Sequence, residues 1–287
     1  MGNIKIGCQT YPWKMNPKRF AGDVPHMVRT AADAGFSGLE AEIGMLGAYF
    51  ENPERVREIL EAYGMQLAAL VLHQPWEGEG ENREEAERTG KAISFLKYFP
   101  LAKLMVSHHA GTKSRGEGEE LQKRRENLLS CMNQAAAKAG EAGIVTCYHP
   151  NSAKNSLFRN REDYQVLFAM LERTDVGYAP DIGHIVNGGM DALEVLKMAR
   201  GKIRHVHFKD RKADGSWAVM GEGEIDYPGI VRYLEETGYG GWIMVEDESP
   251  LAGEDSDGVV RMDGEYMKRF MQVPKHKKEL KIHFYHF

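Results

Sequence analysis

The chain has 287 residues, and 37 lysines and arginines stand against 42 aspartates and glutamates, which gives a net charge of −5. Hydrophobic residues make up 42% of the chain and charged residues 28%, a composition that excludes disordered, collagen-like and coiled-coil proteins and can fill a sizeable core. The mild acidity disfavours a nucleic-acid binder, which needs a basic face. No apolar stretch reaches the roughly 18 residues of a membrane span, so we expect no membrane partner.

The first residues and the cysteines predict a cytoplasmic protein. Met1–Gly7 runs straight into a strand-like pattern, without the apolar run and cleavage site of a secretory signal. Ile6 stands where a myristoylation motif needs Ser or Thr. Cys8, Cys131 and Cys147 are far apart and lack paired metal spacing, so we expect reduced, buried thiols.

Short β-rich runs alternate with longer amphipathic runs along the whole chain. Several of the short runs are almost continuously apolar, such as LAALVL and GWIMV, which is typical of parallel strands covered on both faces. The predicted strands, in chain order, are Ile4–Gln9, Gly38–Ile43, Gln66–Leu72, Lys103–His108, Ile144–His149, Val176–Pro180, Ile203–Phe208 and Trp242–Glu246.

Capping residues and glycines mark helices between these strands. The clearest predicted helices follow Asp23 and end at Gly35, cover Pro53–Tyr63 after Asn52, cover Glu119–Ala142, run from Asp191 to near Gly201, and cover Tyr227–Glu236 after Asp226. This alternation without linkers predicts an α/β fold, a single (β/α)₈ TIM barrel over residues 1–273 with a short C-terminal extension over 274–287. The alternative, an open doubly wound sheet, lacks a glycine fingerprint after the first strand.

Histidines gather at the predicted strands. Active-site residues of a (β/α)₈ barrel lie at the carboxyl ends of its strands. Seven of the 11 histidines lie in or just after a predicted strand, namely His73, His108, His109, His149, His184, His205 and His207. We interpret this clustering as the signal of a site at the barrel mouth.

The sharpest subset is His149, Asp181, His207 and Glu246, from the consecutive strands five to eight. Two imidazoles and two carboxylates suit one divalent ion, Mn²⁺, Co²⁺ or Zn²⁺, and less well Mg²⁺. Structural roles compete with this interpretation. Asp181 could cap a helix, Glu246 could belong to a solvated charge run, and one of His205 and His207 could be a hydrogen-bonded core histidine.

Two other features have plain structural interpretations. Trp13 and Trp76 are more often packing residues than platforms for a sugar ring. The segment Gly221–Glu224 lacks the Lys and Ser or Thr of a phosphate-binding loop, and we expect a turn there.

Four segments resemble the xylose-isomerase-like TIM barrels. They are PDIGH (Pro180–His184), IRHVHFKD (Ile203–Asp210), GEGEIDYPGIV (Gly221–Val231) and GYGGWIMVED (Gly238–Asp247). This superfamily includes sugar isomerases, sugar epimerases and inosose dehydratases. The resemblance implies one bound divalent metal ion.

Three of the four proposed ligands match this family's pattern. Asp181, His207 and Glu246 stand at the family's Asp, His and final Glu. At strand five, His149 stands where sugar epimerases usually carry Glu, and this position is closer to the inosose dehydratase-like members. Asn151 or a nearby carboxylate is the alternative ligand.

The resemblance also implies proton abstraction next to a carbonyl, through an enediolate that the metal stabilises. Glu246 is the first choice for the base, His149 is its partner on the opposite side, and His184 protonates or orients a substrate hydroxyl. The predicted substrate-binding residues are Trp13, Glu40, His73, His108, Asn151 and Lys209.

Two reactions share this intermediate. Return of the proton gives an isomerase or epimerase acting on a ketose or related polyol, which the make-up of the superfamily favours. Loss of a β-hydroxyl gives a dehydratase of a keto-polyol, which His149 favours. A non-catalytic sugar-binding barrel is the alternative from another class. The expected partners are a small sugar or keto-polyol and, by analogy with family barrels, a second copy of the chain.

Overall fold

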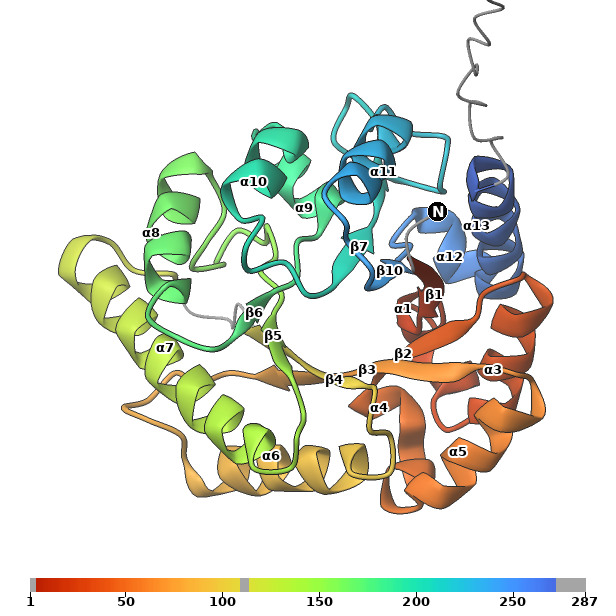
Figure 1. Ribbon diagram of the computed structural model, residues 1–287, viewed down its shortest axis with the longest axis horizontal. Coiled ribbons are helices and arrows are strands. Elements are labelled where there is room, and N and C mark those ends of the chain that lie inside the picture. The colour runs from red at the N-terminus through yellow and green to blue at the C-terminus, as the bar shows by residue number, and fades with distance from the viewer. Residues whose placement is uncertain (1–3, 109–113, 272–287) are drawn as a thin grey trace, which may run out of the picture.

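The computed structural model describes residues 4–108 and 114–271, and it confirms the (β/α)₈ barrel (Figure 1). Eight parallel strands lie in the order β6-β5-β4-β3-β2-β1-β10-β7. Their bounds are β1 (Lys5–Gln9), β2 (Gly38–Glu42), β3 (Gln66–Gln74), β4 (Lys103–His108), β5 (Thr146–Tyr148), β6 (Gly177–Tyr178), β7 (Val206–Phe208) and β10 (Trp242–Val245).

Sparse pairing between β6 and β7 closes the ring. The two strands are joined through the parallel bridges Tyr178↔Ile203 and Asp181↔His207. The Tyr178 amide donates to the Lys202 carbonyl at 2.7 Å, and the His207 amide donates to the Pro180 carbonyl at 2.8 Å. We call this join the seam; it brings Asp181 and His207 side by side.

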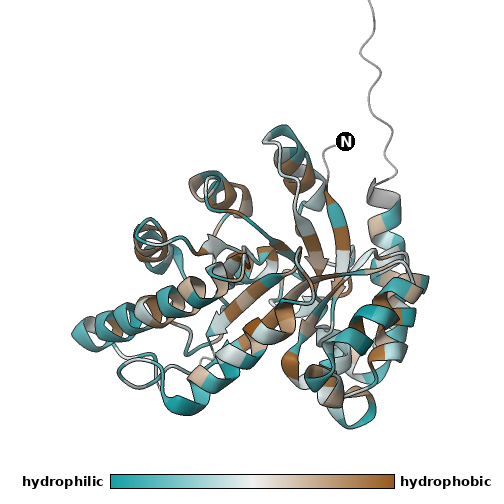
Figure 2. Cartoon of the chain, turned by 60° about the horizontal axis from the view of Figure 1, so that its bottom comes forward, coloured by the Kyte–Doolittle hydropathy of each residue, from teal (hydrophilic) through white to brown (hydrophobic). Residues whose placement is uncertain are grey.

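Helices surround the strands (Figure 1) and turn polar faces outward (Figure 2). The longer ones are α3 (Val24–Asp33), α5 (Pro53–Ala62), α6 (Arg83–Leu96), α7 (Gly118–Gly140), α8 (Arg161–Leu171), α10 (Ala192–Met198), α11 (Tyr227–Glu236) and α13 (Ser256–Met271). The shorter ones are α1 (Tyr11–Lys14), α2 (Pro17–Phe20), α4 (Ile43–Leu46), the 3₁₀ helix η1 (Gly47–Glu51), α9 (Ile182–Asn187) and α12 (Pro250–Glu254).

The predicted caps are present. The Asp23 and Asn52 side chains accept hydrogen bonds from the His26 and Arg55 amides. Each cap satisfies an amide that the first helical turn leaves without a partner. Local sequence therefore fixes where α3 and α5 begin.

Alternate residues of the buried strands pack on opposite sides of the barrel wall. Leu70, Leu72 and Leu104 belong to the main core, which includes buried residues of the surrounding helices. Ala69, Val71 and Met105, which adjoin them in sequence, form a small second cluster together with Cys147 and Ala179. Val71 and Met105 of this cluster line the cavity described below, so it forms part of the cavity floor.

Several boundaries differ from the prediction. Strands five to seven are shorter than expected, five and six at both ends and seven at its start. A hairpin of β8 (Asp210–Arg211) and β9 (Trp217–Ala218) was not predicted. The proposed extension 274–287 and His109 lie outside the described residues. Within the described ranges, no helix has the length and apolarity needed to cross a bilayer.

Candidate metal and substrate site

A cavity of about 740 Å³ opens at the carboxyl ends of the strands. The predicted site residues that line it are Glu40, His73, His108, His149, Asn151, His184, His207 and Glu246. The fold therefore brings together side chains from β2, β3, β4, β7, helix α9 and the loops after β5 and β10. Its size suits a small polar molecule.

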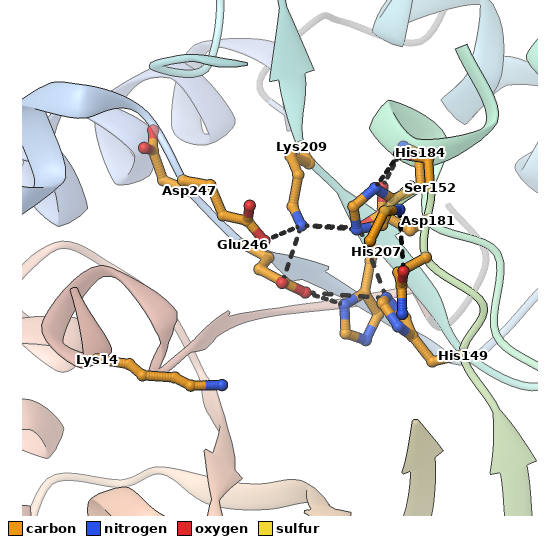
Figure 3. A network of polar contacts seen from close by, with 12 residues as sticks. Lys14, His149, Ser152, Asp181, His184, His207, Lys209, Glu246 and Asp247 are labelled. Carbon is orange, nitrogen blue, oxygen red and sulfur yellow. Dashed lines mark hydrogen bonds and ion pairs between the residues drawn. The ribbon is translucent and has the colours of Figure 1, made fainter. Parts of the chain in front are cut away.

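Asp181, His149, His207 and Glu246 converge as predicted (Figure 3). Each offers a ligand atom, and these atoms all lie within 4.8 Å of one another. His149 Nε2 lies 3.5 Å from Asp181 Oδ2 and 3.9 Å from Glu246 Oε2, and His207 Nδ1 lies 2.7 Å from Glu246 Oε2. We call these four residues the metal cluster.

Three buried atoms of the metal cluster lack the hydrogen-bond partner that burial normally requires. They are His149 Nε2, Asp181 Oδ2 and His207 Nε2, the last of which faces Glu40. Buried polar atoms without a partner are rare and are often explained by a bound ion. Two nitrogen and two carboxylate donors fit Mn²⁺, Co²⁺ or Zn²⁺, so the residues present fit the implied ion.

Asp181 has both of the roles that its sequence context allowed. Its Oδ1 accepts the His184 amide at 2.8 Å and caps α9. Its Oδ2 is the atom that faces His149. Burial would raise the pKa of Asp181, but Lys209, together with His184 and His149, holds the pKa below its usual range. The carboxylate is therefore ionised and ready for a cation.

Lys209 supplies a buried positive charge beside the metal cluster. Its Nζ lies 2.9 Å from Glu246 Oε1, 2.6 Å from Glu248 Oε1 and 3.4 Å from Asp181 Oδ2. Burial would raise the pKa of Glu246, yet Lys209 and His207 hold it well below its usual range. Lys209 was predicted to bind substrate, but its ammonium group is fully buried among these carboxylates.

Glu40 lies beneath the metal cluster and contacts two histidines. Its Oε1 lies 3.1 Å from His207 Nε2, and its Oε2 lies 2.8 Å from His205 Nε2. Burial opposes a charged imidazole at position 207, but the charge of Glu40 and the contact with Glu246 raise the pKa of His207 to about 10. Burial lowers the pKa of His205 to about 4 despite its contact with Glu40.

Glu40, His205 and His207 also bring ligand atoms within 4.8 Å of one another. Their separations of 2.8 and 3.1 Å are those of directly contacting ion pairs, although the four atoms are not in hydrogen-bonding geometry. We therefore interpret Glu40 as a residue that orients His207, with Nδ1 of that ring turned to the metal cluster. A carboxylate behind a histidine ligand is a common way to fix the ring and its tautomer.

The opposite wall of the cavity carries a more open group of charges. Glu42 accepts a hydrogen bond from Lys14 Nζ at 2.8 Å and lies 3.1 Å from His73 Nε2. Asn151 Nδ2 donates to the His108 carbonyl at 3.3 Å, which ties the loop after β5 to β4. Three of the predicted residues on this side, Glu40, His73 and His108, therefore lie at the cavity.

Trp13 lies away from the cavity. Its side chain is fully buried, and its Nε1 donates to Asp257 Oδ1 of α13 at 2.7 Å. In the short helix α1, residues three apart share a face, so Tyr11 and Lys14 line the cavity and Trp13 faces the other way. The contact predicted between Trp13 and substrate is therefore not supported, and its packing alternative is.

Sequence reasoning left out several cavity residues. Besides Tyr11 and Lys14, these are Gln9, Glu42, Ser152, Asn187, Trp217 and Glu248. Lys14 and Glu42 could have been found from their positions, shortly after the first predicted strand and near the end of the second. Trp217 could not, because it reaches the cavity on the unpredicted hairpin, where its ring contacts His184 edge-on at 5.3 Å between centroids.

Similar proteins agree with this fold. An inosose dehydratase of Clostridium perfringens (strain 13 / Type A) is 26% identical over 284 residues, which cover 87% of this chain and 92% of the relative. A crystal structure of IolI protein with a bound zinc atom has a TM-score of 0.74 and 14% identity, and covers 93% of this chain and 97% of its own.

A third similar protein is an epimerase. The structure of 3-keto-D-glucoside 4-epimerase from E. coli has a TM-score of 0.72 and 17% identity, and covers 93% of this chain and 99% of its own. The model of the xylose isomerase-like TIM barrel family matches residues 28–269. The chain therefore belongs to the xylose isomerase-like TIM barrel family.

Proposed function

We propose that this protein is a metal-dependent dehydratase that removes water from an inosose or a similar keto-polyol. The observation that carries the proposal is the buried metal cluster at the cavity, in which His149 takes the strand-five position. Inosose dehydratases among the similar proteins support the choice of reaction. This choice reverses the order that the make-up of the superfamily favoured.

The metal cluster would hold the ion through His149, Asp181, His207 and Glu246. When bound, a divalent ion polarises the substrate carbonyl and stabilises negative charge that develops beside it. The chain's own contribution is to keep Asp181 and Glu246 ionised, through Lys209, and to orient His207, through Glu40.

Glu248 is the group best placed to move the proton. Glu246 was the first choice from sequence, but its Oε1 and Oε2 contact Lys209 and His207. Glu248 lines the cavity outside the metal cluster and accepts a bond from Lys209. We assign Glu248 to take the proton from the carbon next to the carbonyl.

The proton that Glu248 takes from carbon is also the one needed to release water. Glu248 passes it to the β-hydroxyl as the carbon–oxygen bond breaks, so that one water leaves and an enone remains. Such a positioned acid–base group is worth about 10²–10⁴-fold in rate. Glu246 is then a ligand, and His149 and His184 complete the walls around the reacting carbons.

The isomerase or epimerase is the second candidate function. The similar 3-keto-D-glucoside 4-epimerase supports it, and the same groups could return the proton to carbon. One panel separates the candidates. Inososes and ketoses are incubated in D₂O with Mn²⁺, Co²⁺ or Zn²⁺ and followed by mass spectrometry.

A dehydratase gives a product lighter by one water, with new enone absorbance. An isomerase or epimerase gives deuterium exchange at the α-carbon and no other change in mass. Neither outcome across the panel, with the metal bound, would contradict both enzyme proposals and favour the sugar-binding alternative.

A further inference from the structure

A chain of polar side chains runs along the cavity wall from the hairpin to Lys209. Arg211 Nε donates to Asn187 Oδ1 at 3.1 Å, and Asn187 Nδ2 donates to Ser152 Oγ at 2.8 Å. Ser152 Oγ lies 2.8 Å from His184 Nδ1, and His184 Nε2 lies 3.2 Å from Lys209 Nζ (Figure 3). The proposed reaction uses neither Ser152 nor Asn187.

The two ends of this chain fix the direction of every hydrogen bond in it. Guanidinium and ammonium groups only donate. Arg211 therefore holds the Asn187 amide with its oxygen toward Arg211 and its NH₂ group toward Ser152. At the other end, Lys209 requires His184 Nε2 to accept.

This arrangement determines where the His184 proton lies. A neutral imidazole whose Nε2 accepts a hydrogen bond carries its proton on Nδ1. His184 Nδ1–H then donates to Ser152 Oγ. The opposite direction, with Ser152 donating to Nδ1, would place an Nε2–H against the Lys209 ammonium group, donor against donor.

Ser152 is left with one unused hydrogen-bonding group, the proton of its hydroxyl. A hydroxyl group has two acceptor positions and one proton. The amide of Asn187 and the imidazole of His184 fill both acceptor positions, so only the proton of Ser152 remains to be given. Ser152 is buried, and it lines the cavity together with Asn187 and His184.

We propose that Ser152 is a substrate-binding residue whose hydroxyl group donates to one acceptor oxygen, a carbonyl or hydroxyl oxygen, of the bound keto-polyol. The chemical class of this ligand rests on the proposed function, whereas the order of the hydrogen bonds does not. Because both acceptor positions are filled, Ser152 discriminates against an analogue that lacks this oxygen. Its own donor would then be buried without a partner.

The order of the hydrogen bonds can be tested without turnover. In ¹⁵N-histidine-labelled protein, the His184 signals are identified by their loss in the His184→Gln variant. The inference expects the Nδ1–H tautomer, and it expects the signals to move when Ser152 is replaced by Ala. A proton on Nε2 would overturn the inference, whatever reaction the enzyme catalyses.

The binding role is tested with an inosose and its monodeoxy analogues as probes. We expect Ser152→Ala to lower kcat/KM for the parent inosose by about 10- to 100-fold. For one monodeoxy analogue, the variant and the wild type should be equal. Ser152→Thr, which keeps the hydroxyl, should restore most of the loss on the parent compound.

Ser156→Ala is the matched control. Ser156 is buried in the same loop, but its Oγ donates to the Phe158 carbonyl at 3.5 Å, away from the residues that line the cavity. Loss of kcat/KM by the same factor on every analogue, or no loss at all, would overturn the binding role. If the wild type converts no inosose, the proposed function fails. Calorimetric binding of the same probes then replaces kcat/KM, and an inosose that does not bind overturns this inference as well.

Discussion

The two walls of the cavity carry similar residue types but expose them to water very differently. On the wall formed by β5, β6, β7 and β10, the side chains of the metal cluster are at most 8% exposed. On the wall formed by β1 to β4, the side chains of Lys14 and His73 are 34% and 35% exposed, although Glu42 between them is buried.

Burial changes how much a charged group contributes to stability. A buried charge without a partner is expensive, and losing one partner of a buried pair destabilises strongly. An exposed ion pair contributes little. Substitutions on the metal-cluster wall should therefore lower metal affinity and turnover. Substitutions on the opposite wall should mainly change substrate binding.

The largest effect is expected for Glu246→Gln. We expect Zn²⁺ affinity to fall at least about 100-fold and turnover at least about 1000-fold, because the variant loses a ligand carboxylate. The matched control is Glu42→Gln on the opposite wall, whose Zn²⁺ affinity should stay within about threefold of the wild type. The metal content of the purified proteins, measured by mass spectrometry, tests this difference. Equal loss of metal in both variants would contradict the proposed difference between the two walls.

The second effect separates proton transfer from metal binding on the same loop. Glu248→Gln should lower turnover by about 10²–10⁴-fold and leave the number of bound Zn²⁺ ions unchanged. Steady-state kinetics and calorimetric titration of Zn²⁺ measure the two quantities separately. If Glu248→Gln turns over at the wild-type rate, the proton belongs to another group.

Glu40→Gln tests how far the metal cluster depends on a residue of β2 in the opposite wall. The variant keeps the size of the side chain but weakens its hold on His207, so Zn²⁺ affinity should fall by about 10- to 100-fold. Turnover of the fully metal-loaded variant should change much less than its affinity. An unchanged dissociation constant would instead make Glu40 a substrate-binding residue, as the sequence predicted.

Metal binding should release a proton. In the metal-free protein the pKa of His207 is raised to about 10, so this ring is charged at neutral pH, whereas a metal ligand must be neutral. Apparent Zn²⁺ affinity should therefore rise by about tenfold for each pH unit from pH 7 to 9. Calorimetry in buffers of different ionisation enthalpy measures the released proton directly, and a release of zero would contradict this assignment.

The same raised pKa affects the metal-free fold in the opposite direction. The charged His207 contributes its full stabilisation below about pH 6.5, its pKa in the unfolded chain, and this stabilisation is lost as the pH rises towards 10. Chemical denaturation should therefore show a smaller free energy of unfolding for the metal-free protein at pH 9 than at pH 7. In Glu40→Gln this decline should be smaller.

The smallest effect is expected at Lys14. Lys14→Met removes one partially exposed ion pair, so the free energy of unfolding should change by less than about 1 kcal/mol. Zn²⁺ affinity should not change, and any effect on activity should be on KM. A loss of bound metal in this variant would show that the two walls are coupled.

Much of the fold could be predicted because its signals are local. Continuous apolar runs such as Gln66–Leu72 mark buried strands, and Asp23 and Asn52 mark the helix starts that the structure confirms. The gathering of the metal cluster also followed from the fold, since the carboxyl ends of neighbouring parallel strands meet at one mouth.

Side-chain direction and long-range partners could not be predicted in this way. Trp13 and Tyr11 are two residues apart, but the turn of α1 sends one to α13 and the other to the cavity. The orientation of Asn187 depends on Arg211, which lies 24 positions further along the chain. Such contacts arise from packing between elements, which no local pattern encodes.

The thin seam between β6 and β7 gives the ion a second consequence, a mechanical one. Asp181 and His207 face each other across one of the two bridges that close the ring, and both belong to the metal cluster. An ion bound by both residues would cross-link β6 and β7 where few backbone hydrogen bonds join them. Binding and release of the ion would then stabilise and destabilise the closure of the barrel.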